Sequence, residues 1–406
     1  MKTCLQGPNR RRGLFVVFHG IWPTIFESQV LIHVQEMRSL GIDMEVWVFP
    51  LSRANYAASA LHRAELEQRY GVTIRLFQGF NPRLPFAEIL NALRLARALR
   101  RSAVRPEFIH ARTDYSTLVC GLVRMFCPFE LIWDCRGDAV AEFGMSKPAT
   151  GMLARFVRFA KMRVAAGYRA AARRFSTKAI FVSELLRDRC LPNSDHRPVE
   201  VIPCCASERS FFFSSSLRCV GRERMSIDSD QLVLAFVGSI SHYQCFHEAV
   251  DLFRCVVGRS GRAVFLVITP NQEEARDALR TLPSENYRLF SARINQVNEY
   301  LNAADFGVFL RERNAINDVA SPVKFAEYCL AGLPVIMTDA VVQATAHGRL
   351  LGNAIEFELG SSPTQLERWS DDQRAALAAR AIPLLGRSAA VTKYFRLYQA
   401  GKGSEN

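Results

Sequence analysis

The sequence lacks the short motifs that most directly identify a site. It contains neither the G-x-G-x-x-G fingerprint of dinucleotide-binding folds nor the phosphate loop G-x-x-x-x-G-K-[ST]. Its 11 cysteines include no C-x-x-C pair and no Cys/His cluster with zinc spacing, so we expect no metal site. Scattered cysteines, odd in number, in a chain this long favour reduced thiols and therefore a cytoplasmic protein.

The sequence also has no long apolar run, since none approaches the ~18 residues that a transmembrane helix needs. The segment RRRGLFVVFHGIWPTIF near the start resembles a signal peptide. However, His19 and Pro23 interrupt its apolar part, and no clean small-residue cleavage site follows. We therefore expect a first buried strand at residues 14–18 instead.

What the sequence does have is the composition of a globular protein. Of its 406 residues, 49% are hydrophobic and 22% are charged, and this length predicts two domains. The formal net charge of +13 favours an anionic partner, which could be a nucleotide, a nucleic acid or an acidic membrane surface.

Short apolar runs alternate with helical stretches in both halves of the chain, which is typical of α/β folds with parallel sheets. The predicted strands of the first half are residues 14–18, 44–49, 73–77, 108–111, 131–134, 179–182 and 199–202. Those of the second half are residues 232–237, 263–269, 287–290, 306–310 and 335–337. Residues 204–231 are rich in serine and charge and have no period, so we interpret them as a connection between two domains.

The segment SPVKFAEYCLAGLPVIMTD predicts a helix of about ten residues and then a buried strand. Ser321 is the expected N-cap, Pro322 suits the first helical position, and Gly332 is the expected left-handed stop. Lys324 then lies in the first turn, where the helix dipole disfavours a cation. Two explanations remain open, namely a pair with Glu327 on the same face or a phosphate bound by the lysine and the free N–H groups.

This segment resembles the donor-site signature of family-4 retaining glycosyltransferases of the GT-B fold. The segments IHARTD, IWDCRGD, AIFVSELL and LAFVGSISHYQ resemble other parts of that family in the same order, so the resemblance spans most of the chain. It implies an α/β architecture of two Rossmann-like domains facing across a cleft. Residues 1–205 would form the acceptor-side domain and residues 206–384 the donor domain, and a helix at about 385–406 would pack back on the first domain.

The resemblance also implies that the helix near residue 321 lies under a nucleotide diphosphate and that Glu327 holds the ribose hydroxyls. Sugar transfer needs fixed cations and N–H groups to stabilise the departing diphosphate, and these can act without a metal. The catalytic candidates are Lys324, Arg311 and His110. The donor-binding candidates are Glu327, Gly238, Ser239, Ser321, Pro322 and Val323. For Gly238, a plain turn at a strand end is the alternative.

Weaker candidates follow the strands of the first domain, on the acceptor or sugar side. They are Glu27, Ser28, Arg112, Asp134 and Arg136. Each has a structural alternative. His110 could be a satisfied core histidine, the 134–138 cluster could be a local ion pair, and Glu27 and Ser28 could cap a helix.

Two departures from the family pattern weaken the expected diphosphate site. Many relatives carry a glutamate eight residues before the ribose glutamate, where this chain has Val319. Many also carry Arg and Lys in the loop after the first donor-domain strand, where this chain has only His242 as a candidate cation. A non-catalytic nucleotide- or glycan-binding subunit with a decayed site therefore remains the alternative. Nucleotide-sugar epimerisation would need acid/base pairs that the sequence does not display.

Residues 149–178 are basic throughout and contain no acid. They predict amphipathic helix with an apolar stripe on one side. On the opposite side lie Arg155, Arg158, Arg169 and Arg173. This face could be a solvated surface packed on the core, or these arginines could dock on anionic lipid head groups. Nucleic acid is not expected, because aromatic interleaving and a reader motif are lacking.

The sequence thus predicts a glycosyltransferase that moves a sugar from a nucleotide-diphosphate sugar to a glycan or lipid-linked acceptor in cell-surface polysaccharide biosynthesis. We expect it in the cytoplasm, with a place on the inner membrane face. No cofactor is expected, because the nucleotide-sugar is a substrate.

Overall fold

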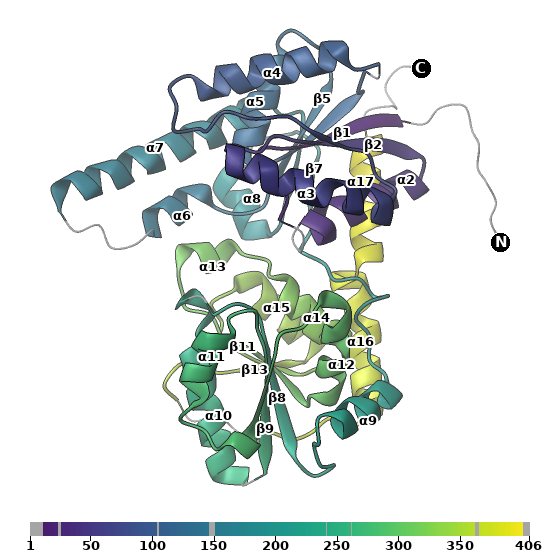
Figure 1. Cartoon of the computed structure of the whole chain (residues 1–406), viewed down its shortest axis with the longest axis vertical. Coiled ribbons are helices and arrows are strands. Elements are labelled where there is room, and N and C mark those ends of the chain that lie inside the picture. Colours follow the sequence, from purple (N-terminus) through teal and green to yellow (C-terminus); the bar gives the residue numbers. More distant parts are fainter. Residues whose placement is uncertain are drawn as a thin grey trace. The chain divides into compact units, whose positions relative to one another are not determined.

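The structure is a computed structural model that describes residues 11–22, 26–103, 105–145, 151–240, 242–260, 262–361 and 365–400. It divides into two compact α/β units (Figure 1). Unit 1 comprises Met1–Val201 and Val391–Asn406, and unit 2 comprises Ile202–Ala390. The chain therefore leaves unit 1 at residue 201, four residues before the predicted seam, and returns to it at residue 391.

Unit 1 is built on a parallel seven-stranded sheet of order β3-β2-β1-β4-β5-β6-β7. Its strands are β1 (Arg11–Val17), β2 (Ile42–Val48), β3 (Ile74–Leu76), β4 (Phe108–Arg112), β5 (Glu130–Cys135), β6 (Lys178–Phe181) and β7 (Val199–Val201). Short runs of Val, Ile and Phe form these strands because both faces of a parallel sheet are buried.

Helices cover both faces of this sheet. They are the π-helix η1 (Glu27–Leu31), α2 (Ile32–Ser39), α3 (Arg53–Tyr70), α4 (Ala87–Arg101), α5 (Asp114–Arg124), α6 (Ala139–Met145), α7 (Met152–Phe175), α8 (Glu184–Cys190) and the C-terminal part of α17 (Arg387–Gln399). Successive strand residues point to opposite faces. Leu14 and Val16 of β1 accordingly belong to the core that α4 and α5 cover. Phe15 instead stacks on His110, on the face that α2 and α17 cover.

Unit 2 has a parallel six-stranded sheet of order β10-β9-β8-β11-β12-β13. Its strands are β8 (Leu232–Val237), β9 (Ala263–Ile268), β10 (Tyr287–Phe290), β11 (Phe306–Phe309), β12 (Val335–Met337) and β13 (Ala354–Glu356). Its helices are α9 (Ser215–Arg224), α10 (Phe246–Ser260), α11 (Gln272–Leu279), α12 (Ile294–Ala303), α13 (Ala315–Val319), α14 (Val323–Leu330), α15 (Val342–Leu351) and α16 (Asp371–Leu385), with 3₁₀ turns η2 (His242–Gln244) and η3 (Ser284–Asn286).

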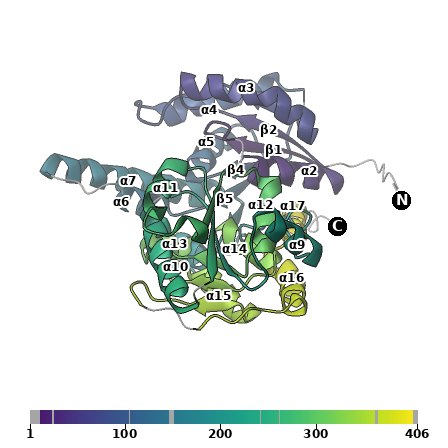
Figure 2. The same cartoon turned by 60° about the horizontal axis from the view of Figure 1, so that its bottom comes forward.

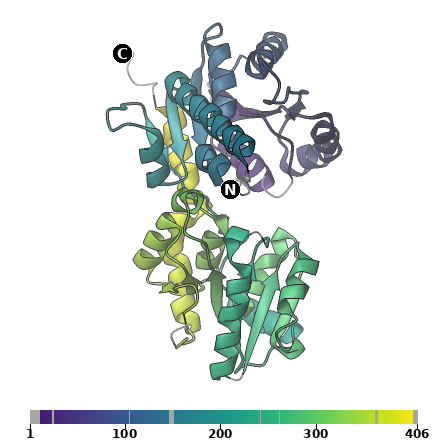
Figure 3. The same cartoon turned by 90° about the vertical axis from the view of Figure 1, so that its left-hand side faces the viewer.

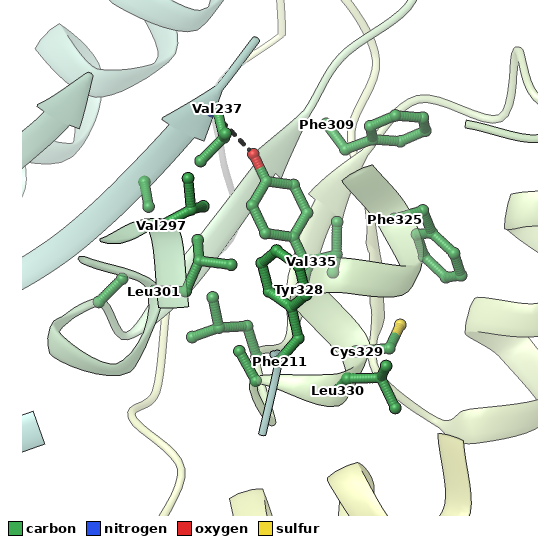
Figure 4. Close-up of a cluster of buried hydrophobic side chains, with 14 of the residues drawn as sticks. Phe211, Val237, Val297, Leu301, Phe309, Phe325, Tyr328, Cys329, Leu330 and Val335 are labelled. Carbon is green, nitrogen blue, oxygen red and sulfur yellow. Dashed lines mark hydrogen bonds between the residues drawn. The ribbon is translucent and has the colours of Figure 1, made fainter. Parts of the chain in front are cut away.

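Two hydrophobic cores sandwich the sheet of unit 2, whose helices lie on both sides of the strands in Figure 3. One core joins alternate residues of β8 to α12, α14 and α16, and the other joins the intervening residues to α10 and α11. At the centre of the first core, the Tyr328 hydroxyl accepts a hydrogen bond from the Val237 N–H at 3.0 Å (Figure 4). The α14 helix is thereby fixed to the end of β8.

The two ends of unit 2 meet. Ala206 and Gly386 form a parallel β-bridge, in which the Ala206 N–H donates to Leu385 O and the Arg387 N–H donates to Ala206 O. Beyond this bridge, Lys393 of α17 donates from Nζ to Val201 O at 3.0 Å, inside unit 1. The start of α17 thus runs beside the segment that leads from unit 1 into unit 2, at residues 201–206.

The predicted fold class is confirmed: both halves are α/β with parallel sheets. The predicted strands all occur, within a few residues at their ends. Two expectations were incomplete. Strand β13 was not predicted, and the connecting segment contains helix α9, which has Ser214 as its N-cap and buries Gly221 and Arg222.

Candidate functional site

The helix at the centre of the sequence argument is α14, and its start differs from the prediction. It has eight residues, begins at Val323, and has Pro322 rather than Ser321 as its N-cap. The Ser321 hydroxyl accepts a hydrogen bond from the Cys204 N–H at 3.0 Å, so it holds the connecting segment instead of the first turn. The capping prediction was therefore wrong, and none of the described side chains caps the N-terminus of α14. Gly332 follows the helix with φ of +70°, as predicted.

Lys324 and Glu327 form the pair that their spacing allows. The Lys324 Nζ lies 2.8 Å from Glu327 Oε2. Glu327 is buried, whereas the Lys324 side chain is one-third exposed at 33%. Because the ammonium remains accessible, this pair is compatible with either explanation of the lysine, since an anion can approach the same group.

Arg311 is the most unusual cation of this region. Its side chain is buried, with 7% of the residue exposed, and its guanidinium donates to Leu310 O at 2.8 Å and stacks over the Phe309 ring at 4.5 Å. Among the residues that the structure describes, it forms an ion pair with no carboxylate. Burial lowers the pKa of Arg311, which means that the charged form lacks compensation. Such a cation is stabilised by binding an anion.

The backbone around Arg311 is fixed by a residue that the sequence analysis did not single out. Thr338 accepts from the Arg311 N–H at 2.9 Å and donates to Arg311 O at 2.8 Å through the same hydroxyl. Thr338 directly follows β12, the neighbour of β11. A threonine after a buried strand is too common a pattern to have identified this role.

Gly238 and Ser239 follow β8, as predicted. Gln244 of η2 donates from Nε2 to Ser239 Oγ at 2.7 Å, and a Cβ on Gly238 would lie 2.8 Å from Gln244 Oε1. Because Gly238 has no side chain, the loop after β8 can pack closely against the Gln244 side chain of η2. Ser241, in the middle of the expected phosphate loop, lies outside the described residues.

These groups share one edge of the sheet. Strands β8, β11 and β12 are neighbours, and Gly238, Arg311 and Thr338 follow their carboxyl ends. Because α14 leads into β12 from the opposite direction, its N-terminus lies at the same edge. In the described part of the chain, this edge thus brings together a buried arginine with no carboxylate partner, a partly exposed lysine, a helix start without a side-chain cap and a buried carboxylate. These groups can bind an anion that also carries hydroxyl groups.

The candidates of unit 1 assemble around a buried carboxylate. Asp134 is fully buried, and Arg136 donates from Nε to its oxygens at 2.8 and 3.0 Å. Arg112 Nη1 and His110 Nε2 lie 3.7 and 3.1 Å from Asp134 Oδ2. Burial alone would raise the pKa of Asp134, but the charge of Arg136, the contact with His110 and the charge of Arg112 together lower it. The predicted local ion pair exists, although Asp138 belongs to another cluster.

His110 is a structural histidine in this arrangement. Its ring has no exposed surface, its Nδ1 lies 2.7 Å from the Tyr398 hydroxyl, and burial lowers its pKa. The same hydroxyl lies 2.7 Å from Nε2 of His33. A ring enclosed by Asp134, Phe15 and Tyr398 has no surface with which to contact a substrate. The catalytic interpretation of His110 is therefore corrected in favour of the core alternative.

Glu27 also has local partners. Its carboxylate accepts from the Tyr70 hydroxyl at 2.6 Å and from Arg69 at 3.1 Å, which ties η1 to the end of α3. Glu27 and Ser28 lie within η1 and not at its cap, so the capping alternative was wrong as well.

The basic helix forms as α7, but its arginines do not share one surface. Arg169 is turned inward, where Nη2 donates to Asp138 Oδ1 at 2.6 Å and Nε lies 3.7 Å from Asp114 Oδ2. Arg158 donates to Gly144 O of α6 at 3.3 Å. Arg155 and Arg173 are exposed. A lipid contact through all four arginines is therefore wrong, because two of them hold the helix to unit 1.

Comparison with known proteins defines the class of fold. No protein-family model matches the chain, and no curated protein is significantly similar in sequence. Among solved structures, HepE from Anabaena in complex with UDP is similar over 95% of this chain and 99% of that one, with 12% identity and a TM-score of 0.67. Sucrose-phosphate synthase from Thermosynechococcus elongatus is similar over 96% and 98%, with 12% identity and a TM-score of 0.59.

A third similar structure is the lipopolysaccharide outer core galactosyltransferase WaaB, over 95% of this chain and 99% of that one, with 10% identity and a TM-score of 0.60. At these identities the likeness establishes the fold, which is the GT-B fold of two Rossmann-like domains. It does not by itself assign a reaction.

Proposed function

We propose that the protein is a glycosyltransferase that transfers a sugar from a nucleotide-diphosphate sugar, with the donor bound at the carboxyl edge of the unit 2 sheet. The observation that carries the proposal is Arg311, a buried guanidinium with no carboxylate partner among the described residues, beside the strand end where nucleotide-binding α/β sheets hold phosphate. Binding a diphosphate would supply the missing negative charge.

In this proposal Lys324 and Arg311 contact the diphosphate oxygens, and the free N–H groups of the first turn of α14 add backbone dipoles. Their work is to stabilise the charge that grows on the leaving diphosphate as the bond to the sugar breaks. Glu327 accepts hydrogen bonds from the ribose hydroxyls, and because its carboxylate is already buried, little desolvation is added on binding.

The finer features rest on the resemblance of the α14 segment to family-4 enzymes. We propose retention at the anomeric carbon, transfer without a metal, and a glycan or lipid-linked acceptor in cell-surface polysaccharide biosynthesis. Groups of three or more potential metal-ligating side chains do not occur in the described part of the chain. Similar structures include HepE with UDP-glucose, which supports a nucleotide-sugar as the donor class. A cytoplasmic protein working at the inner membrane face suits a lipid-linked acceptor.

The test combines binding and turnover across a panel of nucleotide-sugars. Calorimetry with the matching nucleoside diphosphates identifies the base, and mass spectrometry detects transfer or slow hydrolysis of the sugar. We expect Glu327→Ala to weaken nucleotide binding at least tenfold. Lys324→Ala should lower turnover more than binding, because its charge matters most when the leaving group departs.

Arg311→Met should abolish diphosphate binding while leaving the fold intact or slightly more stable, since it removes an uncompensated buried charge. Arg313→Met is the matched control, because Arg313 lies two residues after Arg311 and its exposed side chain is paired with Asp339. Wild-type binding in the Lys324, Glu327 and Arg311 variants would refute the site. Tight nucleotide binding without turnover of any donor would instead support the non-catalytic binding subunit.

A further inference from the structure

The first half of α7 exposes large apolar side chains. Met152, Phe156 and Phe159 are 88%, 67% and 61% exposed. We call the whole group the α7 apolar face; it consists of Met152, Leu153, Phe156, Val157, Phe159 and Val164. Isolated exposed apolar residues are ordinary, but a contiguous group on one helix indicates an interaction surface.

This face points away from the rest of unit 1. The helix contacts its unit through the opposite side, where Ala165 and Ala172 are buried and Arg169 binds Asp138. At 100° per residue, the α7 apolar face lies across the helix from these contacts. Figures 1 and 2 show α7 extending past the strands of unit 1, with α6 beside its first half.

The end of α6 packs on α7 from the side opposite the α7 apolar face, through Met162 and Arg158. Phe143 and Met145 are exposed there, and Gly144 between them approaches Met162 of α7, since a Cβ on this glycine would lie 3.3 Å from Met162 Cε. The tight contact holds the two helices together. A paired, structurally supported arm therefore presents the apolar side chains.

The charge of the arm favours one kind of partner. Residues 152–175 contain seven arginines and lysines and no aspartate or glutamate. Arg155 and Lys161 are exposed on the two borders of the α7 apolar face, and Arg163 is exposed within it. The cores of protein–protein interfaces are depleted of such charges. An apolar strip bordered by cations is instead the pattern of helices that lie in the interface of anionic membranes.

We propose that the α7 apolar face docks on an anionic membrane surface. Its Phe, Leu and Met side chains enter the boundary between head groups and acyl chains, while Arg155, Lys161 and Arg163 contact lipid phosphates. The helix lies on the membrane and does not cross it: within the described residues, no helix is both long enough and apolar enough to span a bilayer. This inference goes beyond the proposed sugar transfer and does not depend on it.

The test is co-sedimentation of the full chain with vesicles, with no sugar donor present. We expect binding to vesicles of phosphatidylcholine that contain about 30% phosphatidylglycerol. Binding to vesicles of phosphatidylcholine alone should be at least tenfold weaker. Phe156→Ser/Phe159→Ser should lower binding to the anionic vesicles at least tenfold. Arg155→Glu/Lys161→Glu should do the same and should remove the salt dependence. The control is Leu61→Ser on α3, where the leucine is even more exposed, at 81%, and it should bind like wild type.

A direct readout of insertion is Phe156→Trp, whose fluorescence should shift to the blue on anionic vesicles and should be quenched by lipids brominated near the head group. Circular dichroism checks that each variant is folded, which exposed positions should allow. Wild-type vesicle binding by the double serine variant would overturn the proposal. The membrane proposal would also be overturned if the wild type binds no vesicles and light scattering shows it to be a dimer that becomes monomeric in the double serine variant. The α7 apolar face would then contact a second copy of the chain.

Discussion

Two buried arginines of unit 2 show how the same type of side chain can either stabilise the fold or be available to bind a ligand. Within the described residues, the side chain of Arg374 donates to four carbonyl oxygens, whereas that of Arg311 donates to one, Leu310 O. Burial lowers the pKa of both, to about 9 for Arg374. The difference lies in how many acceptors the surroundings provide. A cation with four acceptors is structural, and one with a single acceptor is available for an anion.

At the residue scale, His19 makes unit 1 sensitive to acid. Its ring lies against the Trp22 ring with centroids 4.7 Å apart, its Nδ1 lies 2.7 Å from Gly20 O, and burial, aided by the charge of Arg112, lowers its pKa from 6.5 to about 4. A base whose pKa is lower in the folded state binds its proton more readily when unfolded. Its contribution to stability is therefore complete above pH 6.5 and is lost as the pH falls towards 4.

We therefore expect the free energy of unfolding to fall between pH 7.5 and pH 5 by about 2 kcal/mol more in the wild type than in His19→Gln. Urea denaturation followed by circular dichroism at the two pH values measures this difference. If both proteins lose the same stability, the ring is not held neutral by its surroundings.

The site residues show what the sequence could predict at this scale. The positions of Lys324, Glu327 and Gly238 follow from strand ends and a helix start, which local patterns reveal. The roles of His110 and Arg169 did not follow, because they depend on partners far away in the chain, Tyr398 and Asp138. The burial of Arg311 was equally hidden, since an arginine after a strand is more often exposed.

At the scale of elements, the ends of helices depend on tertiary partners. Ser321 has the sequence of an N-cap, yet its hydroxyl accepts a hydrogen bond from the Cys204 N–H of the connecting segment. Buried strands were predictable because their pattern is local. Caps were less so, because a hydroxyl can bind whichever N–H the fold brings to it.

The C-terminal ends of α12 and α14 are held together by a third element. Arg374 of α16 donates to Leu301, Asn302 and Ala304 oxygens at the end of α12 and to Ala331 O at the end of α14, at 2.9 to 3.3 Å. Arg374→Met would remove all four hydrogen bonds. Within the described residues, Arg218 would still donate to Asn302 O and Ala304 O, and the Ala304 N–H to Leu301 O, so Ala331 O is the carbonyl that would lose its donor. We expect it to lower the free energy of unfolding by about 3 kcal/mol, measured by chemical denaturation.

Arg380→Met is the control for this change, because Arg380 lies on the same helix and donates to one carbonyl, Leu351 O. A loss of about 1 kcal/mol or less is expected there. Equal losses in the two variants would show that the caps on α12 and α14 contribute no more than an ordinary surface contact.

At the scale of the whole molecule, the two-domain organisation was predictable from length and from the restart of the α/β pattern. The return of the chain was expected from the resemblance alone. Its physical basis is the hydroxyl of Tyr398, between His33 and His110, together with that of Tyr394, which accepts from Arg136 at 2.8 Å. No local pattern indicates that a tyrosine near the end of the chain completes a core built from its beginning.

A chain shortened after Ala390 should therefore lose stability in unit 1 and not in unit 2. We expect hydrogen exchange measured by mass spectrometry to show loss of protection in β1, β4 and α2, while α14 and β12 stay protected. Nucleoside diphosphate binding should persist. Tyr398→Phe keeps the ring and removes only the hydroxyl, so it should show a milder version of the same effect. Uniform loss of protection across both units would contradict this assignment.

The bridge between Ala206 and Gly386 has a consequence for how such a protein can diversify. Unit 2 is one uninterrupted stretch inserted into unit 1, and its two ends are neighbours, as are the flanking Val201 and Lys393. Cutting the chain at these two neighbouring positions therefore allows unit 2 to be replaced by another domain, while the core of unit 1 stays intact. Recombination in nature, or domain grafting in the laboratory, needs only those two joints.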